Sequence, residues 1–245
     1  MVKLAEQQRI KNKIKKIDSL CWWGDDFDVR FYLINKLKSV QKKIVLDVGG
    51  GIGIICSEMD KTNFRINLDL KYNSLLTCKT ITDSSICNVC ASMLNLPFRR
   101  DVIDVVICSN ILEVGKHQDL INKKQIENHG DCVYPTVNKI LREVSDVLNS
   151  KGIIFITTPN NAYFKSTKLT NKELQKALSS ISKKSKTYFF NTYKRLSKNK
   201  KLNLANVIPK LTAKFSNPDS IIKKLAKDQS KNDYSVAFFV EVKKD

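Results

Sequence analysis

The sequence has few of the residues that build metal sites. It contains only two histidines among 245 residues, and its seven cysteines include one Cys-x-x-C pair, Cys87 and Cys90. A zinc site requires a second such pair or histidines at matching spacing, and the sequence has neither. The pair falls in an apolar stretch that predicts a strand. We therefore interpret the cysteines as structural and expect no metal.

Long apolar runs are absent as well. No run approaches the roughly 18–20 residues that cross a membrane. The N-terminus is charged from its first residues and lacks the apolar segment of a secretory signal. An odd number of cysteines without such a signal favours a reducing compartment, so we expect a cytoplasmic protein.

Two common nucleotide-binding fingerprints are missing from the glycine-rich stretch at residues 49–53. A dinucleotide site needs Gly-x-Gly-x-x-Gly, but the third glycine of one frame would fall on Ile54 and the second glycine of the other on Ile52. The Gly-Lys-Ser/Thr of a phosphate-binding P-loop is not present either. The sequence therefore argues against both of these site types.

A short apolar run followed by alternating glycines is present instead. Residues 44–48 read Ile-Val-Leu-Asp-Val, which predicts a buried strand. Gly49, Gly51 and Gly53 follow, and glycine permits positive φ and lets a ligand lie close to the backbone. Apolar spacing resumes over residues 52–59, as expected of a helix. Together these elements predict a nucleotide-sized ligand site at the carboxyl end of the strand, the alternative being a tight turn that binds nothing.

The pattern Asp47-x-Gly49-x-Gly51-x-Gly53 resembles motif I of the class I methyltransferases that depend on S-adenosylmethionine (SAM). Further segments follow in the order and spacing of that family, including a second strand that ends on Asp69. The resemblance covers roughly residues 28–160 and a last strand near 235–242. It is closest to the quinone-biosynthesis and small-molecule methyltransferases. The matching segments after motif I are residues 64–70, 92–98, 104–114 and 141–160.

The resemblance implies SAM as the methyl donor and S-adenosylhomocysteine as the product, without a metal. The glycines would lie along the methionine half of SAM. Asp47 would act through the conformation of the turn and through the ammonium group of SAM. Asp69 would take the ribose hydroxyls, and Ser92 with the backbone of Met93 would meet adenine. The implied cofactor contacts are Asp47, Gly49, Gly51, Gly53, Asp69, Leu70, Ser92, Met93 and Asn110.

Two positions depart from the family pattern. Ser92 stands where the family carries an acid that meets the adenine amino group, and a hydroxyl accepts such a bond less strongly than a carboxylate. Val114 stands where the family carries a histidine after Leu112 and Glu113. These departures leave open a function without catalysis, that of a binding protein built on the methyltransferase fold.

The expected fold is a doubly wound, seven-stranded, mostly parallel sheet with an N-terminal helical cap and a basic helical insertion before the last strand. We expect a basic helix and cap at residues 1–43 and a SAM-binding core at 44–164. A basic helical insertion at 165–233 and a final strand at 234–245 complete the predicted organisation.

The acceptor side is predicted from loops at the carboxyl ends of strands. Residues 115–135 read as a long loop that holds His117 and His129, of which His117 is the better candidate for a general base. Around the acceptor the family resemblance implies a lid from the N-terminal aromatic stretch and contacts after the fifth strand, the alternatives being ordinary core aromatics and an Asn-Asn turn. These substrate-side candidates are Trp22, Trp23, Arg30, Phe31, Tyr32, Asn160, Asn161 and Tyr163.

Positive charge is concentrated in the flanks of the predicted core. Residues 44–164 are nearly neutral, whereas residues 1–43 carry a net charge of +6 and residues 165–245 a net charge of +14. Such an excess attracts RNA or an anionic membrane surface. A lysine-rich genome background explains it equally well. A small-molecule acceptor is therefore the first hypothesis for the substrate, and RNA is the second.

Overall fold

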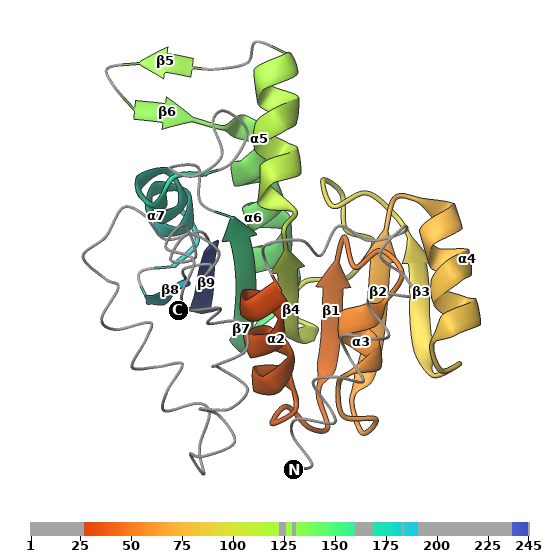
Figure 1. Cartoon of the computed structure of the whole chain (residues 1–245). Coiled ribbons are helices and arrows are strands. Elements are labelled where there is room, and N and C mark those ends of the chain that lie inside the picture. Colours follow the sequence, from red (N-terminus) through yellow and green to blue (C-terminus); the bar gives the residue numbers. More distant parts are fainter. Residues whose placement is uncertain are drawn as a thin grey trace, which may run out of the picture.

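The apolar runs predicted as strands form one sheet in the computed structural model. The structure describes residues 27–122, 126–128, 131–159, 169–182, 184–190 and 237–244. Within these residues the sheet has seven strands in the order β3-β2-β1-β4-β7-β9-β8, and all are parallel except β9. The predicted seven-stranded, mostly parallel sheet is confirmed (Figure 1).

Six of the seven strands are five to seven residues long, and β7 has 12 residues. Their bounds are β1 Ile44–Val48, β2 Phe64–Asp69, β3 Ile86–Cys90, β4 Ile103–Ser109, β7 Leu148–Pro159, β8 Ser185–Phe190 and β9 Ala237–Lys243. The strand order reverses at β1, which lies between β2 and β4, so the glycine turn after β1 lies at the switch point of the sheet.

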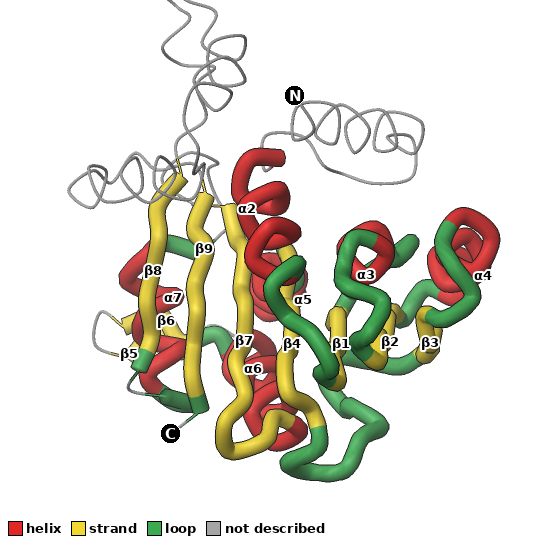
Figure 2. The backbone as a smooth tube through the Cα atoms, turned by 90° about the horizontal axis from the view of Figure 1, so that it is seen from below, coloured by secondary structure: helices red, strands yellow, loops and turns green. Residues whose placement is uncertain are grey.

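Helices cover both faces of the sheet (Figure 2). One face packs against α2 (Phe27–Leu37), α3 (Ile54–Ser57) and α4 (Tyr72–Ile81). The other packs against α6 (Pro135–Val147) and α7 (Asn171–Ser179), and against the start of α5 (Leu112–Ile121). Alternation along β1 produces both cores, because Val45 faces the first layer while Leu46 and Val48 face the second.

The prediction of a long loop at residues 115–135 is wrong. Helix α5 continues to Ile121, and a small hairpin follows, formed by β5 (Ile126–Asn128) and β6 (Asp131–Val133). The sequence concealed this helix because its buried face is polar: Lys116 is 2% exposed and Asp119 is 0% exposed. Without apolar side chains at those positions, the spacing of about 3.6 residues typical of an amphipathic helix is lost.

The helical insertion predicted at residues 165–233 is wrong at residues 185–190, and residues 191–233 lie outside the described residues. Its first element is the predicted capped helix, α7, in which Thr170 and Glu173 form a capping box. Ser185–Phe190, however, form the edge strand β8, which pairs with β9. Three consecutive aromatic residues end this strand, and aromatic side chains are enriched in strands. The helix expected over 52–59 is also shorter than predicted, since α3 ends at Ser57.

Five cysteines have side chains that the structure describes, and all five are free thiols. Cys87 and Cys90 lie in β3, as predicted, and are exposed, whereas Cys56, Cys78 and Cys108 are buried. No helix in the described ranges is both long and apolar enough to cross a membrane.

A buried arginine ties the amino end of β2 to the neighbouring turns. Arg65 is 0% exposed, and its guanidinium donates to Asp83 at 2.9 Å and to the carbonyl of Cys56 at 3.3 Å. When a buried charge loses its counterion, the free-energy cost of its desolvation is no longer compensated. The Asp83 carboxylate therefore stabilises the β2–α4–β3 unit through Arg65.

We expect Asp83→Ala to lower the free energy of unfolding by about 2 kcal/mol, because the Arg65 guanidinium stays buried without its carboxylate. Urea unfolding of the purified variant measures this loss. The control is Asp146→Ala, since the Arg100–Asp146 pair is separated by 3.5 Å with side chains 80% and 56% exposed, and it should change stability by less than about 0.5 kcal/mol. Equal effects of the two substitutions would contradict the assignment.

Candidate functional site

The turn after β1 places three glycines in the left-handed region. Gly49, Gly51 and Gly53 have φ values of 68°, 58° and 71°, which side chains other than glycine rarely adopt. The N–H of Gly50 donates to the carbonyl of Leu68 at 3.1 Å, so the loop lies against β2. The alternating glycines are therefore required by the backbone itself.

Space around the four loop glycines differs from one to the next. A Cβ at Gly49 would lie 2.5 Å from Ile111, and one at Gly53 would lie 2.3 Å from the sulfur of Cys78. A Cβ at Gly51 would have no atom within 4 Å. The glycine loop is thus packed on most sides and open at Gly51, as a backbone surface that receives a ligand must be.

Position 50 requires glycine for lack of space. A Cβ there would lie 2.2 Å from Oδ1 of Asn67 and 2.6 Å from Oδ2 of Asp47. Asp47 and Asn67 are both 0% exposed. Sequence reasoning missed Gly50 and Asn67, because neither belongs to the alternating glycine pattern.

The second strand holds Gly51 through a carboxylate. Oδ2 of Asp69 accepts the N–H of Gly51 at 3.0 Å, and Oδ1 accepts the N–H of Lys71 at 2.7 Å. Asp69 is half-buried at the end of β2, and its neighbour Leu70 is 69% exposed. A carboxylate oxygen has more than one lone pair, so Asp69 can accept further donors from a ligand while it positions the glycine loop.

The segment after β3 reaches the same edge of the sheet. The N–H of Ala91 donates to the carbonyl of Asp69 at 3.2 Å, which places Ser92 and Met93 beside the end of β2. The hydroxyl of Ser92 accepts the N–H of Leu94 at 3.2 Å. Further along, the N–H of Leu96 donates to Glu143 of α6 at 2.9 Å and anchors the Leu-Pro-Phe loop.

The ends of β4 and β7 complete this edge. Asn110 follows β4 with φ 56°, and its N–H donates to the carbonyl of Thr157 at 2.8 Å. One turn further on, the half-buried Glu113 accepts the hydroxyl of Thr158, which is buried in β7. Sequence reasoning assigned no role to Glu113 beyond its place in the family turn.

Parallel strands therefore gather most of the predicted cofactor contacts at one edge. These are the glycine loop, Asp69, Leu70, Ser92, Met93 and Asn110, which follow β1, β2, β3 and β4. Asp47 lies beneath them, inside β1.

The predicted substrate-side residues are less well represented. Tyr32 is 1% exposed and packs in the core under α2, as in the alternative interpretation of the aromatics. His117 is exposed, but it lies on helix α5 and not in a loop. Outside the described residues lie Trp22, Trp23, His129, Asn160, Asn161 and Tyr163, together with the side chains of Arg30 and Phe31.

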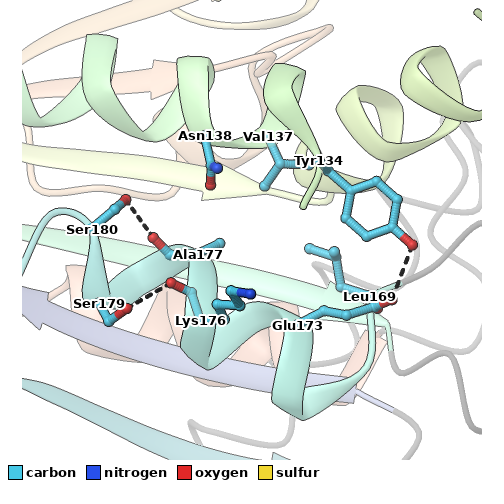
Figure 3. A pocket seen from close by; sticks show the side chains of 9 residues that line it. All are labelled: Tyr134, Val137, Asn138, Leu169, Glu173, Lys176, Ala177, Ser179 and Ser180. Carbon is cyan, nitrogen blue, oxygen red and sulfur yellow. Dashed lines mark hydrogen bonds between the residues drawn. The ribbon is translucent and has the colours of Figure 1, made fainter. Parts of the chain in front are cut away.

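A cavity of about 210 Å³ lies between α6 and α7 (Figure 3). At one end the hydroxyl of Tyr134 donates to Glu173 at 3.0 Å. The ammonium of Lys116 also donates to Glu173, at 3.0 and 3.2 Å, and lies 4.6 Å from the centre of the Tyr134 ring. The cluster of Lys116, Tyr134 and Glu173 connects α5, α6 and α7. Lys116 is also one of the side chains that interrupt the apolar pattern of α5.

The sequence matches the methyltransferase domain family over residues 39–206. An uncharacterized protein of Methanocaldococcus jannaschii is 30% identical over 109 residues, which are 44% of this chain and 46% of that protein. The match thus spans less than half of that relative.

Solved methyltransferases have a similar fold. A SAM-dependent methyltransferase of Aquifex aeolicus superposes with a TM-score of 0.56 at 11% identity over 96% of this chain and 98% of the other. One from Archaeoglobus fulgidus gives 0.53 at 16% identity, over 88% and 94%. A chain from the complex between the Haloferax volcanii Trm112 methyltransferase activator and a putative methyltransferase gives 0.55 at 14% identity, over 97% and 95%.

Glu173 should contribute to stability in a pH-dependent way. Burial opposes its ionisation, but the Thr170 N–H, the Lys116 ammonium and the Tyr134 hydroxyl outweigh burial and hold its pKa below the usual value. A depressed folded-state pKa adds stability above the unfolded-state pKa, and this stability is lost as pH falls through the folded-state pKa.

We therefore expect Glu173→Gln to be less stable than the unmodified protein at pH 7 by about 1–2 kcal/mol, with a difference that shrinks below about pH 4. Urea unfolding across this range measures it. A difference independent of pH would show that the carboxylate charge does not carry the interaction.

Proposed function

The chain belongs to the methyltransferase domain family, and on that basis we propose that it transfers a methyl group from SAM to a small-molecule acceptor. The observation that carries the cofactor assignment is the glycine loop, which has close neighbours at Gly49, Gly50 and Gly53, is open at Gly51 and is held there by Asp69. Its place at the switch point of a doubly wound sheet is where such folds bind nucleotides.

The residues at this edge fit SAM in the order in which the strands present them. The loop from Gly49 to Gly53 would receive the methionine half, with the buried Asp47 beneath it. Asp69 would accept the ribose hydroxyls with lone pairs that Gly51 and Lys71 leave available. Exposed Leu70 would cover the adenine, which Ser92 and the backbone of Met93 would meet at its edge. The backbone at Asn110 would close the methionine end.

SAM supplies an activated methyl group: the acceptor's electron pair forms the new bond to the methyl carbon while the carbon–sulfur bond breaks and S-adenosylhomocysteine remains. The protein's contribution is then chiefly to align the acceptor with the methyl group and sulfur. The acceptor would enter beside the ends of β4 and β7, where Glu113 and Thr158 lie. His117 and Tyr163 stay candidates for moving a proton, and Trp22, Trp23, Arg30 and Asn160 for contacting the acceptor.

The two departures from the family pattern have modest consequences in this arrangement. Ser92 keeps an oxygen at the adenine side, in a turn in which it accepts the N–H of Leu94. Val114 is 52% exposed on α5, so the missing histidine leaves no hole in the core. Membership of a methyltransferase family favours an enzyme over the non-catalytic alternative.

RNA is a second candidate acceptor because of the charge distribution. The core at residues 44–164 carries a net charge of −1, whereas the two flanks together carry +20, so the flanks account for the positive charge of the chain. An RNA-binding protein should lose affinity steeply as salt rises, because bound phosphates release counterions. Micromolar binding of a tRNA that weakens at least tenfold between about 50 and 200 mM salt would favour RNA. If the protein does not bind tRNA at low salt, RNA is removed as a candidate acceptor.

We expect calorimetric titration to show micromolar binding of SAM and S-adenosylhomocysteine and none of NADH. Asp69→Ala should weaken both by about tenfold or more, because the ribose loses a charged acceptor and Gly51 loses its anchor. Asp146→Ala, on the exposed face of α6, serves as the control and should bind like the unmodified protein. Unchanged affinity in Asp69→Ala would refute the ribose assignment. Failure of the unmodified protein to bind either compound would refute the cofactor assignment itself.

A further inference from the structure

A row of polar side chains crosses three neighbouring strands beneath the glycine loop. Asp47 of β1 is in register with Asn67 of β2, and Asn67 is in register with Asn88 of β3. Asp47 and Asn67 are 0% exposed, and Asn88 is half-buried. Polar groups inside a sheet of Val, Ile and Leu are costly unless hydrogen bonds compensate for the lost water. The bonds made by this row therefore indicate what it does.

Asn67 uses both hydrogens of its amide nitrogen. Nδ2 donates to the carbonyl of Gly51 at 3.0 Å and to Oδ1 of Asn88 at 2.9 Å. The acceptor on Asn88 requires a donor opposite it, which orients the Asn67 amide with its nitrogen towards the loop. The other side of the amide, Oδ1, lies against Gly50, where it would be 2.2 Å from any Cβ. The carboxamide thus both supports the loop and bonds to it.

Gly51 is consequently held at both of its polar backbone atoms by β2. Its N–H donates to Asp69 and its carbonyl accepts from Asn67, each at 3.0 Å. Asn67 and Asp69 are two residues apart on the same strand and so lie on the same face. Gly51 is also the loop glycine that is open to a ligand. Its position is therefore determined by two side chains rather than by packing.

We propose that Asn67 is a positioning residue for cofactor binding, which acts through the Gly51 carbonyl, and that Asn88 orients it. The proposal rests on the proposed function and adds to it a determinant of affinity outside the glycine motif. A loop held in its bound conformation before the ligand arrives spends less binding free energy on ordering. Loss of the Asn67 amide would release the Gly51 carbonyl and permit other φ values at a residue with no side chain to restrict it.

Three substitutions test this role. Asn67→Leu keeps the branched outline of the side chain and removes both hydrogen bonds, so S-adenosylhomocysteine should bind about tenfold more weakly. Asn88→Asp keeps an acceptor for Asn67 and should bind within about twofold of the unmodified protein. Leu68→Val lies between Asn67 and Asp69 but faces the opposite core, where Leu68 is 1% exposed. It should lower the melting temperature without changing affinity.

Affinity is measured by calorimetry and stability by thermal unfolding. Substitution of a purely structural residue would change only the stability. If Asn67→Leu lowers the melting temperature but binds S-adenosylhomocysteine as tightly as Leu68→Val does, the positioning role is wrong. Asn67→Ala replaces Asn67→Leu should the leucine variant not fold, with the same expectation.

Hydrogen exchange separates this proposal from the proposed function. In the ligand-free protein the Gly51 N–H should exchange at least tenfold faster in Asn67→Leu than in Asn88→Asp, whichever ligand the site binds. If the unmodified protein binds neither SAM nor S-adenosylhomocysteine, the cofactor assignment fails while this measurement still tests the support of Gly51 by Asn67. Equal exchange rates of the Gly51 N–H in the two variants would overturn the proposed support of Gly51 by Asn67.

Discussion

The close approach of the glycine loop to β2 is the constraint on which the site depends. The N–H of Gly50 bonds to the carbonyl of Leu68, and Gly51 is held by Asp69. This approach leaves no room for a side chain at Gly50, where a Cβ would meet Asn67 of β2. Other elements fill the space at Gly49 and Gly53, where a Cβ would meet Ile111 and Cys78. Neighbouring atoms thus occupy the space that side chains would fill at three of the four loop glycines, and the loop is open at Gly51.

Buried polar contacts carry much of the connection between the other elements. Lys116 and Tyr134 converge on Glu173 and join three helices, while Asp119 of α5 accepts the N–H of Thr136 at the start of α6, at 2.9 Å. A carboxylate at a helix N-terminus also meets the positive end of the helix dipole. On the opposite face, Arg65 ties β2 to the turn before β3. In each case a buried polar side chain binds partners from another element of the fold.

Several parts of the fold and site could be predicted from local sequence. The strand at Ile44–Val48 is a short, mostly apolar run, and the strand at Phe64–Asp69 alternates apolar and polar residues. The capped helix follows from Thr170 and Glu173. The helix from Leu112 to Ile121 could not, because Lys116 and Asp119 occupy positions where a pattern search expects apolar residues. Their partners, Glu173 and Thr136, lie 57 and 17 residues away along the chain.

The sequence by itself determined the strand–glycine–helix unit and the alternation of Gly49, Gly51 and Gly53, since each depends on residues close together in the chain. It also determined the family, because the order and spacing of several short segments can be read along the chain. Tertiary structure decided which side of the loop stays open, why position 50 must be glycine, and that Asn67 rather than glycine alone supports Gly51. These features depend on the register between β1, β2 and β3. Register follows from the packing of both faces of the sheet at once, so it brings together side chains whose separation in sequence carries no local signal.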